Sequence, residues 1–316
     1  MTNLAAAKAA DVLIIGGGPG GLSAALALAR HLHHIIVFDN GYYRNHAAKH
    51  MHNVLGWDHQ PPTDFRAKAK ENILARYDTV QVKNRTVASI RKIMDGFEAT
   101  DEDGACYMGK KLVLSQGRSD IFPDIKGYGD CWGVSVFHCL FCHGFEERGG
   151  TAGLLALGAL ASENAVLHVA RMAAQLAKSI TVYTHGDEKV AESLREVFAG
   201  KPVQFEPRKI AELVDLPGKG VKIWFGDGES KVEAFLAHIP DTQLSGDLHT
   251  QLELEMENQF GHPCIKTNGM FRETSVSGCF AVGDVCTAVS SVTNAMQTGA
   301  MCAGGLSSQL GSLKWF

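Results

Sequence analysis

Residues 11–40 read DVLIIGGGPGGLSAALALARHLHHIIVFDN and contain the pattern that decides the fold of the N-terminal part. The short apolar run Val12–Ile15 predicts a buried strand that ends at glycine. The glycines Gly16, Gly18 and Gly21 follow it in the spacing G-x-G-x-x-G. In such a loop the first glycine permits a tight turn, the second lets the backbone approach a pyrophosphate, and the third lets the helix pack on the strand.

The sequence after the glycines gives this pattern its context. Alanine- and leucine-rich sequence predicts a helix to about Leu32, a second strand follows from Ile35 to Phe38, and Asp39 ends it. A strand, a glycine loop, a helix and an acid about 20 residues on form a complete dinucleotide-binding βαβ unit. Its helix N-terminus suits a diphosphate, and Asp39 suits the ribose hydroxyls. The alternative, a glycine turn without a ligand, is disfavoured by this complete context.

Size and composition indicate a protein of ordinary globular type. The chain has 316 residues, which suggests about two domains, and it is 45% hydrophobic and 20% charged. Its net charge of −4 and lack of a long basic run argue against nucleic acid or an anionic membrane as a partner. The first ten residues are too short and too weakly apolar for a signal peptide, and no apolar run is long enough to span a membrane. We therefore expect a cytoplasmic protein.

Cys139 and Cys142 are separated by two residues, and the other six cysteines are scattered. Such a pair can close a small disulfide ring that carries two electrons. The pair has three alternative roles. Zinc binding would need a second Cys or His pair, although His138 and His143 flank the cysteines. Attachment of c-type haem would need export, and the third alternative is a purely structural pair. We favour the redox interpretation because a flavin-type nucleotide site precedes the pair and a second nucleotide-like unit follows it.

The second nucleotide-like unit begins near Gly153. The sequence predicts a strand over 154–157, a helix capped by Ser162 that runs to about Lys178, and a strand over 180–184. Short strands with turns at 217–218 and 226–228 follow.

The glycine loop of this second unit lacks its binding chemistry. Only the first glycine, Gly158, remains, and we expect the side chain of Leu160 to stand where a pyrophosphate would approach. Glu163 replaces the third glycine, and the acids Asp187 and Glu188 follow the second strand, where binding an NADP phosphate favours arginine. We expect weak NADPH binding, in a unit that holds the Cys pair in place.

Histidines are concentrated in residues 41–60, at His46, His50, His52 and His59. The four-residue spacing of the first two would suit a metal pair on a helix. The neighbouring Gly, Tyr, Arg and Asn residues instead favour a loop whose polar side chains face a ligand or solvent, and we predict no metal site.

The remaining sequence completes the domain organisation. An amphipathic helix is expected over 64–76, short strands over 80–108, and a buried strand over 111–114 that ends in Ser115-Gln116-Gly117. A linker near 117–126 marks a domain boundary. After Pro240 the chain returns to the first domain, with a strand over 280–282, Gly283-Asp284, and a small-residue helix over 292–310.

These motifs together resemble the low-molecular-weight thioredoxin reductase family over nearly the whole chain: GGGPGG with its following acid, the Cys-x-x-Cys and the late Gly-Asp-Val. The stretches HMHNVLGWDH and HCLFCHGFEERG, with the degraded second loop, resemble its branch of flavin-dependent dithiol oxidases in epidithiodiketopiperazine biosynthesis, typified by gliotoxin and holomycin oxidoreductases. The resemblance implies an α/β protein with two Rossmann-like dinucleotide-binding domains, FAD and a homodimer. It implies an FAD domain in two parts, 1–119 and 241–316, around an inserted degenerate NAD(P)H-like domain, 120–240, that carries the Cys pair.

The resemblance also assigns site residues. It places Asn53 near the isoalloxazine, Asp284 at the ribityl chain, and the backbone N–H groups of Val292 and Thr293 at the flavin pyrimidine edge. The full set expected to bind FAD is Gly16, Gly18, Pro19, Gly21, Asp39, Asn53, Val87, Gly117, Gly283, Asp284, Val292 and Thr293. The set expected to act in catalysis is Cys139, which would be the outer cysteine, Cys142, His143 and His138.

Three departures from the thioredoxin reductase pattern bear on the reaction. The family's ATG is Ser115-Gln116-Gly117 here, the acid usually found after the second cysteine is His143, and the NADPH glycine loop and arginine pair are missing. We therefore expect an oxidase that converts a small-molecule dithiol and O₂ into a disulfide and H₂O₂, with His143 favoured over His138 as the base. The aromatic residues Phe137, Phe141 and Phe145 line a substrate pocket or belong to the core.

Two other functions stay open from the sequence. One is an NAD(P)H-dependent reductase of thioredoxin or a similar disulfide, which needs a working second nucleotide site. The other is a non-enzymatic flavoprotein, such as a redox sensor, which would leave the Cys pair beside the flavin site unexplained.

Overall fold

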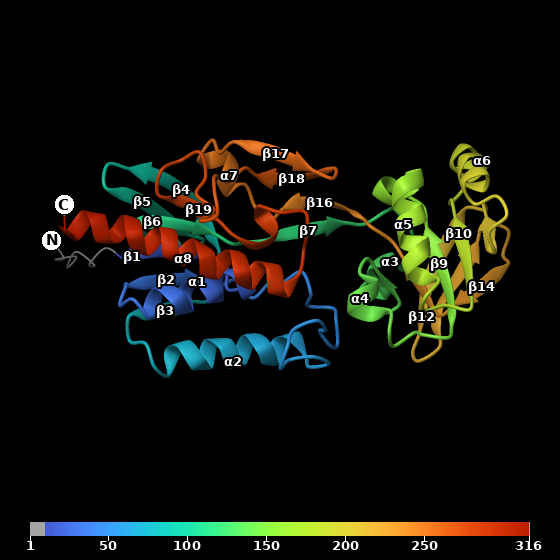
Figure 1. Ribbon diagram of the computed structural model, residues 1–316, viewed down its shortest axis with the longest axis horizontal. Helices are drawn as coiled ribbons and strands as arrows, with labels where there is room; N and C mark the ends of the chain where they lie inside the picture. The colour runs from blue at the N-terminus through green and yellow to red at the C-terminus, as the bar shows by residue number, and fades with distance from the viewer. Residues whose placement is uncertain (1–9, 316) are drawn as a thin grey trace. The chain divides into compact units, whose positions relative to one another are not determined.

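The protein forms two compact units in a computed structural model that describes residues 10–315 (Figure 1). The first unit contains the chain up to Arg44, Thr63–Ser119 and the chain from Gln243 onward, and the second contains Asn45–Pro62 and Asp120–Thr242. Strands β7 (Arg118–Ile121) and β16 (Asp241–Leu244), which carry the chain past residues 119 and 242, pair with each other. The N-terminal residues 1–9, where the sequence predicts no export signal, lie outside the described part.

The boundaries expected near residues 119 and 240 lie at these two strands. The segment 45–62 differs from expectation, because the structure groups it with the second unit and not with the N-terminal domain. Hydrogen bonds from this segment to the residues around the Cys pair, described below, are the physical reason.

The first unit is built on one sheet with strand order β3-β2-β1-β6-β5-β4, and β19 pairs with β6. The pairs among β3, β2, β1, β6 and β19 are parallel, and β5 and β4 extend the sheet as antiparallel strands. Its strands are β1 (Ala10–Ile15), β2 (Ile35–Phe38), β3 (Val80–Lys83), β4 (Val87–Ile93), β5 (Gly96–Asp101), β6 (Cys106–Leu114) and β19 (Cys279–Ala281). The separate pair β17 (Met256–Gln259) and β18 (His262–Ile265) is antiparallel.

Helices α1 (Pro19–Ala29) and α8 (Val292–Trp315) pack closely against each other in this unit (Figure 1). Their backbones approach so closely that a Cβ on Gly299 would lie 2.1 Å from the carbonyl oxygen of Gly20. The other helices of the unit are α2 (Pro62–Leu74), α7 (Leu248–Gln251) and the 3₁₀ turn η2 (Gly283–Val285). The fully buried strand β1 has apolar core on both faces, which explains its near-continuous apolar sequence.

The second unit has a parallel sheet with strand order β11-β10-β9-β15-β8 and a three-stranded antiparallel sheet β12-β13-β14. Its strands are β8 (Val136–Phe137), β9 (Thr151–Leu155), β10 (Ser179–Tyr183), β11 (Val203–Glu206), β12 (Ile210–Leu216), β13 (Gly220–Phe225), β14 (Ser230–Glu233) and β15 (Phe235–Ala237). Its helices are α3 (Tyr128–Cys131), α4 (Leu140–His143), the 3₁₀ turn η1 (Gly158–Ala161), α5 (Glu163–Ala173) and α6 (Glu188–Val197). The predicted α/β class with two Rossmann-like domains is confirmed.

The main differences from the predicted elements are at helix ends. Helix α1 ends at Ala29 and not near Leu32, because Leu32 adopts φ +60° and the N–H of His33 returns to the carbonyl of Leu28. Helix α5 ends at Ala173, since the chain then turns and the N–H of Lys178 bonds to the carbonyl of Gly150. Over residues 10–315 no helix combines the length and the apolar character needed to cross a membrane.

Candidate functional site

The glycine loop of the first unit provides an open helix N-terminus. Position 16 requires glycine, because the φ of Gly16 is +116° and a Cβ would lie 2.3 Å from the carbonyl oxygen of Ser115. Position 21 also requires glycine, since a Cβ on Gly21 would lie 2.0 Å from the carbonyl oxygen of Gly16. Gly18 is different: its φ of −76° suits any residue, and no protein atom lies within 4 Å of an added Cβ. The free space above Gly18 is where a diphosphate would lie.

Helix α1 leaves its first N–H groups available. Gly18 is the N-cap and supplies no side-chain hydrogen bond, Pro19 occupies the first turn, and no acid lies there. Free N–H groups and the positive end of the helix dipole favour a negatively charged phosphate. This part of the chain therefore fits the diphosphate of FAD.

Asp39 directly follows strand β2 and lies beside Gly17 of the glycine loop. Its carboxylate accepts hydrogen bonds from the Tyr43 hydroxyl at 2.6 Å and the Gly41 N–H at 3.0 Å, and it pairs with Lys70. Burial alone would raise the pKa of Asp39, but the hydrogen bonds from Lys70 and Tyr43 hold it below its ordinary value. Asp39 therefore stays ionised at neutral pH and can accept hydrogen bonds from ribose hydroxyls.

The Ser115-Gln116-Gly117 segment follows strand β6. The Ser115 hydroxyl reaches the carbonyl oxygens of Ile15 and Gly16 at 2.8 and 2.9 Å and so fastens the glycine loop to the sheet. The side-chain amide of Gln116 is buried with neither its oxygen nor its nitrogen paired to protein. Such a group calls for a polar partner, and a cofactor bound at this loop would supply one.

The loop at Asp284 is organised by Arg118, a residue that the sequence interpretation missed. Arg118 is 3% exposed and donates hydrogen bonds to the carbonyl oxygens of Asp284 and Thr287. The Asp284 carboxylate itself lies 3.4 Å from a guanidinium nitrogen of Arg44. The only sequence signal for Arg118 was its place directly after Gly117, and an arginine there reads as an ordinary surface residue.

The other residues expected to bind FAD have these positions. The Gly283 N–H donates to the Thr298 hydroxyl at 2.9 Å, and Val292 and Thr293 begin helix α8. Val87 buries its side chain in the core, so only its backbone is available to a ligand. Asn53 belongs to the second unit, where its side-chain amide donates to the carbonyl oxygen of Phe141 at 2.9 Å.

Cys139 and Cys142 form a disulfide at helix α4 of the second unit. Both cysteines are partly exposed. Phe137 is a core residue, 2% exposed, and stacks on Phe235, so it cannot line a pocket for substrate. The side chains of Phe141 and Phe145 are instead exposed at 75% and 61%. The disulfide thus has exposed apolar neighbours.

Two histidines flank this disulfide in the chain. Burial lowers the pKa of His143, and the neighbouring His52 lowers it further. His143 is therefore neutral at pH 7 and able to accept a proton. The ring of His138 stacks on Trp132 with 5.8 Å between centroids.

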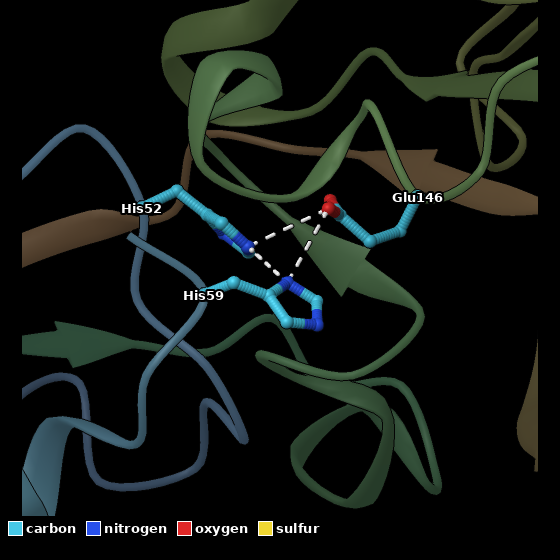
Figure 2. A group of neighbouring side chains, drawn as sticks. All are labelled: His52, His59 and Glu146. Atoms are coloured by element: carbon cyan, nitrogen blue, oxygen red, sulfur yellow. Dashed lines mark hydrogen bonds and ion pairs between the residues drawn. The ribbon is translucent and has the colours of Figure 1, made fainter. Parts of the chain in front are cut away.

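Two histidines of the 45–62 loop, His52 and His59, and Glu146, which follows Cys142 in the chain, form a second group of side chains near the disulfide. His52 Nδ1 lies 2.5 Å from the Cys142 carbonyl oxygen. His52 Nε2 lies 3.0 Å from Nδ1 of His59 and 3.4 Å from Oε1 of Glu146. Figure 2 shows the three side chains pointing toward one another. His52 and Glu146 are far apart in the chain, so no spacing pattern could join them.

His46 and His50 lie in a loop, as predicted. Residues 45–50 contain no helix, His46 is exposed, and the ring of His50 stacks on His59 with 4.4 Å between centroids. A metal pair formed by His46 and His50 on one helix face is thus not what the structure contains.

Side chains of the second unit cap the N-termini of helices α5 and α6. The Ser162 hydroxyl accepts a hydrogen bond from the Ala165 N–H and caps helix α5, and Glu163 lies in the first turn. Asp187 caps helix α6 in the same way, accepting from the N–H groups of Lys189 and Val190. The prediction for Leu160 is wrong: its side chain is fully buried in the core and does not enter the loop's binding space.

Together, the open glycine loop in one unit and the disulfide in the other define a flavoprotein disulfide oxidoreductase. The sequence profile of the pyridine nucleotide-disulphide oxidoreductase family matches residues 10–299. The chain belongs to this family, and FAD is its cofactor.

Named relatives are similar over nearly their full length. Thioredoxin reductase tcpT of Claviceps purpurea is 42% identical over 95% of this chain and 94% of its own. Thioredoxin reductase aclD of Aspergillus oryzae is 41% identical over 96% and 98%. Among solved structures, an oxidoreductase from Agrobacterium tumefaciens matches with a TM-score of 0.84 and 30% identity, covering 96% of this chain and 98% of its own. The structure of HlmI matches with a TM-score of 0.86 and 25% identity, covering 96% and 93%.

Proposed function

We propose that this chain is an FAD-dependent dithiol oxidase. It converts a small-molecule dithiol of the epidithiodiketopiperazine type and O₂ into the cyclic disulfide and H₂O₂. The observation that carries the proposal lies within the second unit. Cys139 and Cys142 are joined as a disulfide, whereas the N-termini of helices α5 and α6 are capped by the chain's own Ser162 and Asp187. The unit thus keeps a thiol-exchange centre and offers little to a dinucleotide.

Disulfide exchange accounts for the bond changes. One substrate thiolate attacks Cys139, which breaks the Cys139–Cys142 bond, forms a mixed disulfide and releases the Cys142 thiolate. The second substrate thiol attacks the substrate sulfur of that mixed disulfide, closes the product disulfide and releases Cys139. The substrate has lost two electrons and two protons. The Cys pair has gained the two electrons, one proton has passed to the base, and the proton of the second thiol passes to the released Cys139 thiolate.

His143 is the proposed base for the substrate thiol. Its neutral imidazole accepts the proton as the thiolate forms, and it follows Cys142 directly in the chain. The exposed rings of Phe141 and Phe145 offer apolar contact to a small ring-shaped substrate. Bound FAD supplies a two-electron acceptor for the reduced Cys pair and a donor to O₂, and Gly18, Asp39 and Gln116 are among the residues that would hold it.

The second candidate is an NAD(P)H-dependent disulfide reductase. It is favoured by the names of the relatives, which are thioredoxin reductases. It requires NADPH to bind the second unit, where Glu163 and Asp187 lie at the helix ends that phosphates would approach.

Anaerobic mixing separates the two functions. The holoprotein is mixed with NADPH in one experiment and with a reduced epidithiodiketopiperazine in another, and bleaching of the flavin absorption is followed. We expect the dithiol to bleach the flavin, NADPH to leave it oxidised, and air to restore the colour with release of H₂O₂. Rapid bleaching by NADPH would make the protein a reductase.

Cys139→Ser tests the thiol-exchange step in the same assay. The variant should retain FAD and lose turnover to the background rate, because no disulfide remains for the substrate to attack. Cys106→Ser, which removes an exposed free thiol, is the matched control and should turn over normally. Normal turnover by Cys139→Ser would refute the mechanism.

The assembly and location belong to the same proposal. We propose a homodimer that acts in the cytoplasm on a small molecule, with neither nucleic acid nor membrane as a partner. Light scattering on the eluting holoprotein measures the mass against the 34.0 kDa chain. A monomer mass would contradict the dimer.

A further inference from the structure

We propose that His52, His59 and Glu146 form a binding site for one divalent cation of the Zn²⁺ class, next to the redox disulfide. This proposal does not depend on the oxidase function. The three side chains belong to the second unit and converge from two chain segments, as Figure 2 shows. Their donor atoms, His52 Nε2, His59 Nδ1 and a Glu146 oxygen, all lie within 4.8 Å of one another.

The distances suit a metal of this class. A tetrahedral Zn²⁺ about 2.0–2.2 Å from nitrogen and oxygen ligands separates those ligands by roughly 3.3 Å. Here the separations are 3.0 Å between the two imidazole nitrogens, 3.4 Å from His52 to Glu146, and 4.0 Å from His59 to Glu146. Only small side-chain adjustments would bring all three atoms onto one ion. Two nitrogens and one carboxylate oxygen also leave a fourth position open, as in catalytic zinc sites.

His52 is oriented for coordination by its other ring nitrogen. Its Nδ1 faces the carbonyl oxygen of Cys142, which can only accept a hydrogen bond, so Nδ1 carries the proton. Its other ring nitrogen, Nε2, faces His59 and Glu146 and is the one available to an ion. A backbone carbonyl that fixes the tautomer of a ligating histidine is the usual outer contact of such sites.

The charges also favour a cation. The Glu146 carboxylate faces two imidazoles that can each offer a lone pair. His59 is exposed, with its side chain 60% accessible, so an ion has a direct path from solvent. An ion held here would cross-link the 45–62 loop to the segment that follows Cys142.

Calorimetric titration of the untagged holoprotein with Zn²⁺, with the Cys139–Cys142 disulfide intact, tests the site. A Cys106→Ser background removes the exposed free thiol as a competing ligand. We expect one Zn²⁺ per chain and a rise in Tm with Zn²⁺, because an ion that binds only the folded state stabilises it. His59→Ala and Glu146→Gln should each weaken binding about tenfold or more and remove the Tm rise.

Neighbouring side chains outside the donor set provide the controls. His50→Ala removes a ring that stacks on His59 without belonging to the group, and Glu147→Gln removes the adjacent acid. Both should bind Zn²⁺ as the parent does. Absence of binding, or equal binding by all four variants, would overturn the proposal. The assay contains no dithiol, so its outcome is separate from that of the oxidase test.

Discussion

His143 is partly buried and is the proposed base for the substrate thiol. Burial and the nearby His52 hold its pKa below the ordinary value, so the ring is neutral at pH 7 and can take up the proton of a substrate thiol. We predict that His143→Gln slows reduction of the flavin by dithiol by about 100-fold or more, the usual contribution of a general base. Stopped-flow absorbance under anaerobic conditions measures this rate.

His138 provides the matched control, because it lies on the other side of the Cys pair and stacks on Trp132. His138→Gln should change the rate far less than His143→Gln, and both variants should retain their FAD. If His143→Gln reacts at the parent rate, the residue is not the base. If His138→Gln is the slow variant, the two roles are exchanged.

Two helices with the same place in a βαβ unit begin in opposite ways. The N-cap of helix α1 is Gly18, which has no side chain to donate or accept a hydrogen bond. The N-cap of helix α5 is Ser162, whose hydroxyl accepts a hydrogen bond from an N–H of the first turn. The glycine at position 18 is required neither by its φ nor by a protein neighbour. A diphosphate bound close to this position would explain the glycine.

Gly18→Ala should therefore weaken FAD binding while leaving the fold intact. We predict at least about a tenfold rise in the FAD Kd, equivalent to about 1.4 kcal/mol, because the new methyl group occupies the diphosphate's space. The capping change itself costs at most about 1 kcal/mol of stability. Gly311→Ala, also with no atom within 4 Å of its Cβ but far along helix α8, is the control and should bind FAD as before. Unchanged FAD affinity in Gly18→Ala would contradict the placement of the diphosphate.

The sequence predicted correctly those elements whose structure depends on residues close together in the chain. The run of apolar residues, glycines and small helical residues over 11–40 predicts β1, α1 and β2 because turn geometry and close packing demand those residue types. The cap at Ser162 was predictable for the same reason. Strand β2 even has the predicted bounds, Ile35–Phe38.

The features that were not predicted from the sequence depend on contacts between residues far apart in the chain. The path of the Leu160 side chain depends on a core assembled from strands β9, β10 and β15, and so it was predicted wrongly. The group His52, His59 and Glu146 depends on the 45–62 loop folding against the Cys segment. Periodicity and motif spacing describe neighbours along the chain, so neither could reveal these contacts.

Stability of the whole molecule should depend on pH through a buried histidine that plays no part in the proposed chemistry. His238 is 2% exposed, and burial lowers its pKa to about 4, against the weaker opposite effects of the Leu157 backbone and Asp241. Its Nδ1 lies 2.6 Å from the buried hydroxyl of Tyr128. In the unfolded chain the imidazole returns to a pKa of about 6.5.

The sign of the effect follows from where protons bind. Between pH 6.5 and 4 the unfolded chain takes up a proton on His238 that the folded chain does not, so the free energy of unfolding falls as the pH falls. The loss amounts to about 2 kcal/mol between pH 7 and pH 5. Denaturant unfolding followed by tryptophan fluorescence suits this measurement, because three of the four tryptophans, Trp57, Trp132 and Trp224, belong to the second unit with His238.

His238→Gln should remove this pH dependence even if it lowers stability at pH 7, because glutamine cannot titrate. His168→Gln, which replaces an exposed histidine of the same unit, should keep the parent's difference between pH 7 and pH 5. Carboxylates also titrate in this range, so the deciding quantity is the parent's difference minus that of His238→Gln. If this quantity is zero, His238 is not the group that makes the folded second unit sensitive to acid.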